Sequence, residues 1–231
     1  TQMHNTTPEK VRFLEAVGFK RVILARELNL DEIRAISSRT SVELEAFVHG
    51  ALCVSYSGRC YLSYAIGGRS ANRGQCAQPC RRRYQLRDGL GQTLTEFQHL
   101  LCLKDLNRAD HLADMLEAGI TSFKIEGRLK DIPYVANIVG FYRRKIDALL
   151  DGTSYSASSS GTSTLSFSPN PRKTFNRGYT SYGLDSREER IAALHTPKSL
   201  GESMGCVEKL GRDYFTLQSP HDLASGDGIC F

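Results

Sequence analysis

The chain has 231 residues, of which 40% are hydrophobic and 24% charged, with no tryptophan and a formal net charge of +5. These proportions are ordinary for a globular protein and exclude a collagen-like, coiled-coil or wholly disordered chain. No apolar run approaches the roughly 18 residues of a membrane-spanning helix, and residues 1–5 have neither the basic nor the apolar region of a signal peptide. We therefore expect a cytoplasmic protein. Since the chain lacks an initiator methionine, we also expect it to be a fragment of a longer one.

Helical and strand-like patterns alternate through the first 150 residues. The first helix is predicted over Pro8–Val17, with Thr6 or Thr7 as its N-cap and Gly18 as its stop. The elements predicted after it are a strand at 21–25, a helix at 30–37 capped by Asn29, strands at 42–47 and 100–103, a helix at 106–118, a strand at 120–125 and a helix at 133–150. This alternation is typical of an α/β fold with a parallel sheet. Four strands are too few for a closed barrel of about 250 residues, so we expect an open sheet or the second half of a (β/α) barrel-like domain.

Three further regions are predicted from composition. Residues 50–91, rich in glycine, cysteine and arginine, interrupt the α/β domain of residues 1–150 as an insertion. Residues 151–175 are rich in serine, threonine and glycine and are predicted to be a linker. Residues 176–231 are predicted to begin a small β module, with strands at 201–207 and 213–217. Because the sequence stops within an apolar, strand-like run, we expect that module to be truncated.

Polar side chains lie at or just after the ends of the predicted strands. They are Glu27, Glu45, His49, Lys104, Asp105, Lys124, Glu126 and Arg128. This edge of a parallel sheet is where α/β proteins place their chemistry. Glu45 and Glu126 are candidate catalytic carboxylates, with salt bridges to Lys124 or Arg128 as the alternative. His49 is a candidate catalytic partner of Cys53, and a hydrogen-bonded structural side chain is the alternative.

The insertion is basic and, up to Arg87, free of acidic residues. No Asp or Glu lies between Glu45 and Asp88, and the 42 residues at positions 46 to 87 carry seven arginines. The arginines are Arg59, Arg69, Arg73, Arg81, Arg82, Arg83 and Arg87, with Tyr56, Tyr61, Tyr64 and Tyr84 among them. Arginines neutralise phosphates and tyrosines stack on unpaired bases. The pattern favours an RNA-binding surface that includes Arg73 and Arg81, with a solvated basic loop as the alternative.

Four of the seven cysteines fall within 28 residues of this insertion: Cys53, Cys60, Cys76 and Cys80. Clustered thiols without a signal sequence favour a metal or cluster site over a disulfide scaffold. The spacing contains no C-x-x-C knuckle, which weakens a zinc-finger interpretation, whereas four thiolates can equally hold an iron–sulfur cluster. The alternative is that two or more of these cysteines are simply buried small side chains.

The segments 45–53 and 58–63 resemble the signature of peptidase family U32, the collagenase-like peptidases. Each fixed position of E-x-F-x-x-G-[SA]-[LIVM]-C-x(4)-G-x-C-x-[LIVM]-S is filled, from Glu45 to Ser63. Further stretches extend the resemblance to most of the chain: 71–76, 79–81, 124–128, 134–135, 142–143 and 176–180. The resemblance implies an α/β barrel-like domain whose first half precedes Thr1.

The resemblance also implies a choice of activities. The family is named for proteolysis, but other members are hydroxylation factors that act on tRNA uridine, on ribosomal RNA cytidine or on ubiquinone precursors, and several hold a 4Fe–4S cluster on four cysteines. Cys53, Cys60 and Cys76 match the first three ligand positions, and Cys80 or Cys102 matches the fourth. We expect iron–sulfur-dependent hydroxylation of a pyrimidine in ribosomal RNA or tRNA.

A small carboxylate is a further expected partner, because Lys124 and Arg128 are suited to binding prephenate or a similar anion. Two other functions stay open. One is a peptidase, although the sequence has no G-x-S-x-G elbow and no H-E-x-x-H helix. The other is an RNA-binding protein in which zinc on the cysteines holds the basic loop without catalysis.

Overall fold

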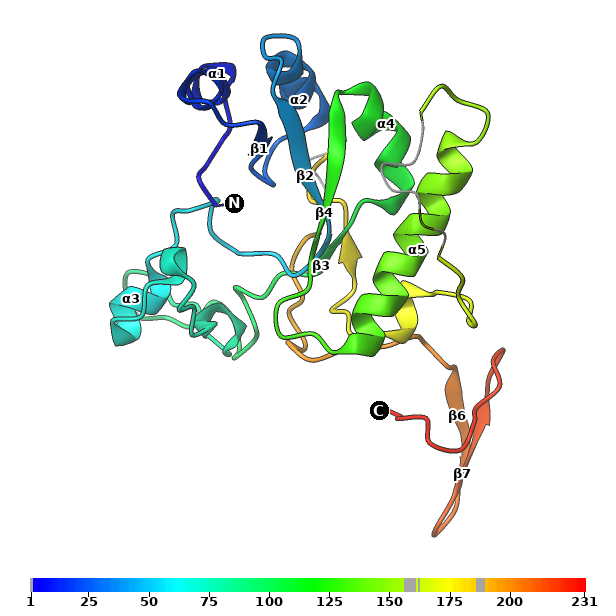
Figure 1. Cartoon of the computed structure of the whole chain (residues 1–231). Helices are drawn as coiled ribbons and strands as arrows, with labels where there is room; N and C mark the ends of the chain where they lie inside the picture. Colours follow the sequence, from blue (N-terminus) through cyan, green and yellow to red (C-terminus); the bar gives the residue numbers. More distant parts are fainter. Residues whose placement is uncertain (1, 156–160, 162, 186–189) are drawn as a thin grey trace.

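The computed structural model describes residues 2–155, 161, 163–185 and 190–231. The helices are α1 (Pro8–Val17), α2 (Leu30–Ser37), α3 (Leu62–Gly67), α4 (Leu112–Glu117) and α5 (Ile132–Leu150), with 3-10 turns at Ala71–Arg73, Pro79–Arg81, Ala109–His111 and Pro171–Lys173. The strands are β1 (Arg21–Ile23), β2 (Glu43–Gly50), β3 (Asp105–Asn107), β4 (Ile120–Glu126), β5 (Tyr179–Thr180), β6 (Cys206–Leu210) and β7 (Phe215–Gln218). Figure 1 shows helices packed beside one sheet, an insertion carrying α3 at its side, and the β6–β7 hairpin projecting from the opposite end.

Strand β2 is the centre of the sheet. It is buried from Leu44 to Gly50, as expected for a strand covered on both faces. β1 pairs with the start of β2 and β4 pairs along it, both in parallel. β3 pairs with the end of β2 in the antiparallel sense, and β5 continues beyond β3. The α/β fold is therefore confirmed, but the sheet is mixed instead of wholly parallel. The described strands form an open sheet and no closed barrel.

The predicted strand at 100–103 is wrong. Cys102 and Leu103 are buried there, but their backbone pairs with the segment 191–193 instead of the sheet: Lys104 N donates to Ile191 O and Ala193 N to Cys102 O. The next residues, Asp105–Asn107, form strand β3 of the sheet. The helix predicted from residue 106 therefore starts only at Leu112, after a 3-10 turn.

The helix caps predicted from the sequence for α1 and α2 are confirmed. The Thr7 side chain accepts a hydrogen bond from Lys10 N, and Gly18 ends α1 in the left-handed region at φ +104°. Asn29 and Glu32 form a reciprocal capping box at α2. Buried apolar residues from β1, β2, β4 and the helices form the main core. No helix among the described residues is long and apolar enough to cross a membrane.

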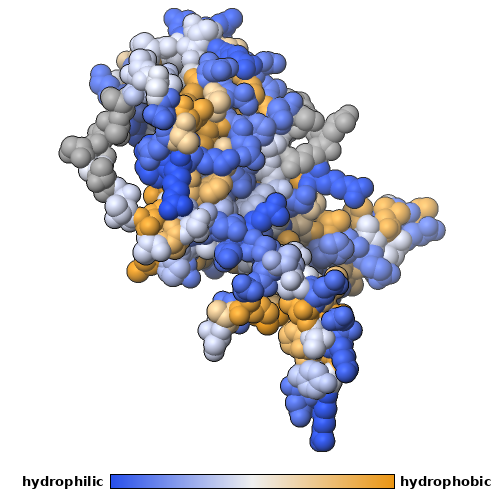
Figure 2. Space-filling view, turned by 90° about the vertical axis from the view of Figure 1, so that its right-hand side faces the viewer, coloured by the Kyte–Doolittle hydropathy of each residue, from blue (hydrophilic) through white to orange (hydrophobic). Residues whose placement is uncertain are grey.

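The two strands predicted in the C-terminal part are present but displaced. They form the antiparallel hairpin β6–β7, with Cys206 opposite Gln218. Figure 2 shows this hairpin projecting away from the body of the protein. Of the predicted linker, residues 156–160 and 162 lie outside the described residues.

Candidate functional site

The carboxyl ends of β2 and β4 meet closely at Gly50. Its partner in the register is Glu126, and a Cβ built on Gly50 would lie 2.1 Å from the Glu126 carbonyl oxygen. Gly50 also has φ +108°, a conformation that a side chain disfavours. Only glycine fits here, and this contact fixes the position from which the insertion leaves the sheet.

His49, one residue earlier, is enclosed by tyrosines. Its ring lies 5.5 Å from the rings of Tyr142 and Tyr179 and 6.3 Å from that of Tyr134, and it is only 1% exposed. The register between β2 and β4 shifts between Phe47 and His49. Such an irregularity redirects a side chain, and here it accompanies the contact of His49 with the tyrosines of α5.

The hydrogen bonds of this cage define the state of His49. The Tyr142 hydroxyl has one proton to donate and two acceptors in reach, Val48 O at 2.7 Å and Asn107 Oδ1 at 3.1 Å, so it accepts from His49 Nδ1, which lies 3.3 Å away. The other ring nitrogen, Nε2, is buried and has no hydrogen-bond partner among the described residues. Burial lowers the pKa of His49 to about 4. The imidazole is therefore neutral at pH 7, and its Nε2 is an acceptor to which none of the described residues donates.

The two candidate carboxylates do not come together. Glu45 pairs in the register with Ser122, four residues before Glu126, which at about 3.3 Å per residue separates them by roughly 13 Å along the sheet. Glu45 lies within β2, not at its end, and accepts from the Ser122 hydroxyl at 2.8 Å. It also faces Arg21 at 3.4 Å and Lys124 at 3.9 Å, which is the salt-bridged environment considered as its alternative.

Two of the predicted substrate-binding cations connect the insertion to backbone next to the carboxyl edge of the sheet. Arg81 donates to Leu52 O and Leu103 O at 2.8 and 2.9 Å and to Cys102 Sγ at 3.0 Å. Arg128, after β4, donates to Gly74 O at 2.8 Å. Both guanidinium groups therefore hold the insertion against the carboxyl edge. Arg73, by contrast, lies exposed on the 3-10 turn Ala71–Arg73.

The four cysteines of the insertion all lie half-buried as free thiols. Burial is the main cause that raises the pKa of Cys53, and the neighbouring thiols of Cys60 and Cys76 raise it further. Burial likewise raises the pKa of Cys80, with contributions from Cys53, Cys76 and Cys102. The thiols thus lie near enough to influence one another. However, no group of three or more His, Cys, Asp or Glu side chains within the described ranges is arranged to hold a metal ion.

Two buried charges near this edge were not singled out from the sequence. Arg177 forms a 2.9 Å ion pair with Asp105, and its backbone N donates to the same carboxylate at 3.0 Å. Because β3 is antiparallel, its first residue, Asp105, lies at the edge where β2 ends. Arg108 is 1% exposed and donates to the carbonyls of Arg26 and Ser181, both at 2.9 Å. Asp105, Arg26 and Ser181 are each 72 or more residues away in sequence from the arginine they contact, so only the fold reveals these pairs.

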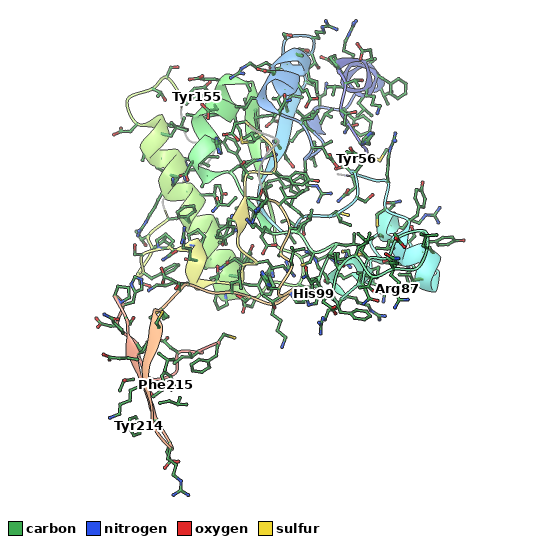
Figure 3. The ribbon with its side chains drawn as sticks, turned by 180° about the vertical axis from the view of Figure 1, so that it is seen from behind. Tyr56, Arg87, His99, Tyr155, Tyr214 and Phe215 are labelled. Atoms are coloured by element: carbon green, nitrogen blue, oxygen red, sulfur yellow. The ribbon has the colours of Figure 1, made fainter. Side chains whose placement is uncertain are left out.

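The surface of the insertion is basic and aromatic. The exposed arginines are Arg59, Arg69, Arg73, Arg82, Arg83 and Arg87, and Tyr56, Tyr61 and Tyr64 are each more than 60% exposed. Figure 3 shows Tyr56 and Arg87 on the side of the molecule that carries the insertion. The acid-free segment predicted from the sequence therefore presents its cations and aromatic faces to solvent.

Comparison with known proteins identifies the family. The sequence profile of peptidase family U32 matches residues 1–193. The chain belongs to peptidase family U32. No solved structure matches it with significance.

Three relatives of this chain are named either as RNA hydroxylation proteins or as collagenases. The 23S rRNA 5-hydroxycytidine C2501 synthase of Escherichia coli is 46% identical over 99% of this chain and 35% of its own length. The tRNA hydroxylation protein P1 of Bacillus subtilis is 35% identical over the whole of this chain and 56% of its own length. A collagenase of Porphyromonas gingivalis is 39% identical over 66% of this chain and 40% of its own. The chain thus spans between about a third and just over half of the length of these relatives.

Proposed function

We propose that this protein is part of an enzyme that hydroxylates a pyrimidine in ribosomal RNA or tRNA, in the cytoplasm. The observation that carries the proposal is the exposed insertion, acid-free up to Arg87, whose arginines and tyrosines share one segment after the carboxyl end of β2 with four free thiols. Phosphate neutralisation and base stacking need such a surface, whereas cleavage of a peptide does not. The relative that covers 99% of the chain is named as a ribosomal RNA hydroxycytidine synthase, which supports the same substrate class.

We further propose a 4Fe–4S cluster on Cys53, Cys60, Cys76 and either Cys80 or Cys102. The residues suit it in kind, since four free thiols share one insertion and the neighbouring thiols help to raise the pKa of Cys53 and of Cys80. When bound, a cluster would supply electron transfer, which side chains cannot perform. The chain's own part is to shield these thiols and to hold the insertion against the sheet through Arg81 and Arg128.

Peptidase activity has less support in the geometry. A cysteine protease needs a thiolate of lowered pKa beside a histidine. Here burial raises the pKa of Cys53, and His49 Nδ1 is bonded to Tyr142 instead. A small carboxylate such as prephenate remains a proposed partner, although Lys124 faces Glu45 and Arg128 is bonded to Gly74 O.

Mass spectrometry of RNA nucleosides tests the function directly. Cells lacking the gene should lose a hydroxylated pyrimidine from ribosomal RNA or tRNA, and the full-length gene should restore it. Unchanged nucleosides, together with peptide cleavage by the purified protein, would instead establish the peptidase. Elemental analysis after anaerobic purification separates the metals: iron supports the cluster, and one zinc per chain without iron supports a non-catalytic RNA-binding protein.

A further inference from the structure

A cavity of about 300 Å³ lies between the N-terminal segment, the end of β1 and the loop that joins Cys53 to Cys60. Its polar and aromatic lining residues are His4, Thr6, Glu27, Glu32, Tyr56 and Arg59. This volume is at the small end of the range for ligand sites and suits one nucleoside. The cavity is separate from the tyrosine cage around His49.

The loop between Cys53 and Cys60 forms one wall of the cavity, and hydrogen bonds hold the middle of this loop in place. Ser57 donates to Glu27 twice, from its backbone N at 2.5 Å and from its hydroxyl at 3.1 Å. Gly58 N donates to the side chain of Gln2 at 3.0 Å, and a Cβ on Gly58 would lie 2.0 Å from the Gln2 carbonyl oxygen. Tyr56 and Arg59 flank this anchor, so both are held at the mouth of the cavity before any ligand binds.

The side chain of His4 has a polar atom whose hydrogen bond is unsatisfied within the described part of the chain. Its Nδ1 is buried and has no hydrogen-bond partner among the described residues. Its backbone has φ +55°, a left-handed conformation that costs energy in a residue with a side chain and that clusters at ligand sites. Its ring meets that of Tyr56 edge-on at 6.2 Å. Burial, followed by the charges of Arg59 and Lys10, lowers its pKa, which favours the neutral ring with one donor and one acceptor.

The other lining groups match a nucleotide in position and in chemistry. Tyr56 is 65% exposed and offers a face on which a base stacks. Arg59 is exposed beside it and suits a phosphate. Glu27 has acceptor capacity left after its two bonds from Ser57, since a carboxylate offers about four acceptor positions. Carboxylates accept from the amino group of cytosine, whereas uracil presents a carbonyl oxygen at that place.

We propose that this cavity holds the target base of a single-stranded RNA and prefers cytosine to uracil. The inference rests on the proposed function and names the site at which its substrate binds. The same eight-residue loop that forms the wall ends in Cys53 and Cys60. Tyr56 is therefore three and four residues along the chain from two of the thiols proposed to hold the cluster.

Binding of labelled pentanucleotides to the full-length protein tests the site without requiring activity. For oligocytidine, we expect Tyr56→Ala to weaken binding by about 5- to 160-fold, the usual effect of losing one stacked base. Tyr56→Phe, which keeps the ring, should bind like the wild type. Tyr155→Ala is the matched control, because Tyr155 is 58% exposed and lies on the other side of the sheet domain (Figure 3). Glu27→Gln should remove the preference for oligocytidine over oligouridine.

The outcomes separate this inference from the proposed function. If the wild type hydroxylates RNA but Tyr56→Ala binds oligocytidine as tightly as Tyr155→Ala does, the cavity is not the base site and the function stands. If no RNA is hydroxylated while Tyr56→Ala alone loses binding, the function is wrong and the pyrimidine site stands. Equal binding of oligocytidine and oligouridine by the wild type would overturn the preference for cytosine.

Discussion

The sheet and the insertion are stabilised in different ways. The sheet buries an apolar core from β1, β2, β4 and the helices, with Val48 and Ile120 fully inaccessible. The insertion exposes many of its large apolar side chains, among them Leu90 at 88%, and depends on polar contacts such as those of Arg81. Burial of apolar surface is the dominant stabilising contribution to folding. The comparison indicates that apolar burial stabilises the sheet, whereas polar contacts to the rest of the chain hold the insertion in place.

The largest effect is expected where the two regions join. Gly50→Ala should lower the free energy of unfolding by about 3 to 5 kcal/mol, because it adds a clash with Glu126 to a strained backbone. Gly18→Ala is the matched control, since its φ of +104° is similar but nothing lies within 4 Å of the added Cβ. It should cost only about 1 to 2 kcal/mol. Urea denaturation of both variants measures the difference, and equal losses would show that the contact with Glu126 is unimportant.

The second prediction concerns the pH dependence of the sheet. The pKa of His49 is about 4 in the folded protein against 6.5 as its ordinary value, so between these values the unfolded chain binds one more proton. Stability should therefore decrease as the pH falls from 6.5 towards 4, by up to about 3 kcal/mol from this residue. His49→Phe should show a shallower decrease in pH-dependent urea denaturation than the exposed control His221→Phe. Identical slopes would mean that His49 is protonated in the folded state.

A smaller and local effect is expected in the insertion. Arg81→Ala removes three hydrogen bonds to Cys102, Leu103 and Leu52, worth about 1 to 3 kcal/mol together. Hydrogen exchange should become faster around residues 76–84, while amides in β2 and β4 keep their protection. The neighbouring exposed Arg82 provides the control, Arg82→Ala. Uniformly faster exchange in the sheet would show that the two regions do not unfold separately.

The smallest effect is expected at the surface. Arg73→Ala should weaken the binding of single-stranded RNA to the full-length protein slightly. It should reduce the slope of log affinity against log salt by about 0.7, the contribution of one phosphate contact. Arg212→Ala, on the turn of the β6–β7 hairpin, should leave the slope unchanged. A change in Arg212→Ala but not in Arg73→Ala would move the RNA surface from the insertion to the hairpin.

The same contrast explains what could be predicted from the sequence. Caps such as Thr7, Asn29 and Gly18 are local signals, so α1 and α2 have the predicted bounds. β3 has three residues and exists only because Asn107 pairs with His49 and Asp105 with Tyr179, which no local pattern reveals. The apolar run at 100–103 shows burial but not the partner of its backbone.

The candidate site also combines features that are local in sequence with contacts between distant residues. The clustering of cysteines and arginines could be predicted because it is local in sequence. The tyrosine cage of His49 joins residues 85 or more positions apart along the chain, and the cavity joins His4 to Tyr56. Only the fold brings these side chains together.

The most direct test of the account is the content of hydroxylated pyrimidine in RNA from a gene-deletion strain that carries single cysteine variants of the full-length gene. The account predicts that Cys53→Ser, Cys60→Ser and Cys76→Ser fail to restore the modification, as does one of Cys80→Ser and Cys102→Ser. Cys206→Ser and Cys230→Ser, on exposed residues outside the insertion, should restore it fully. Full restoration by the first three variants would contradict the claim that the insertion carries the chemistry.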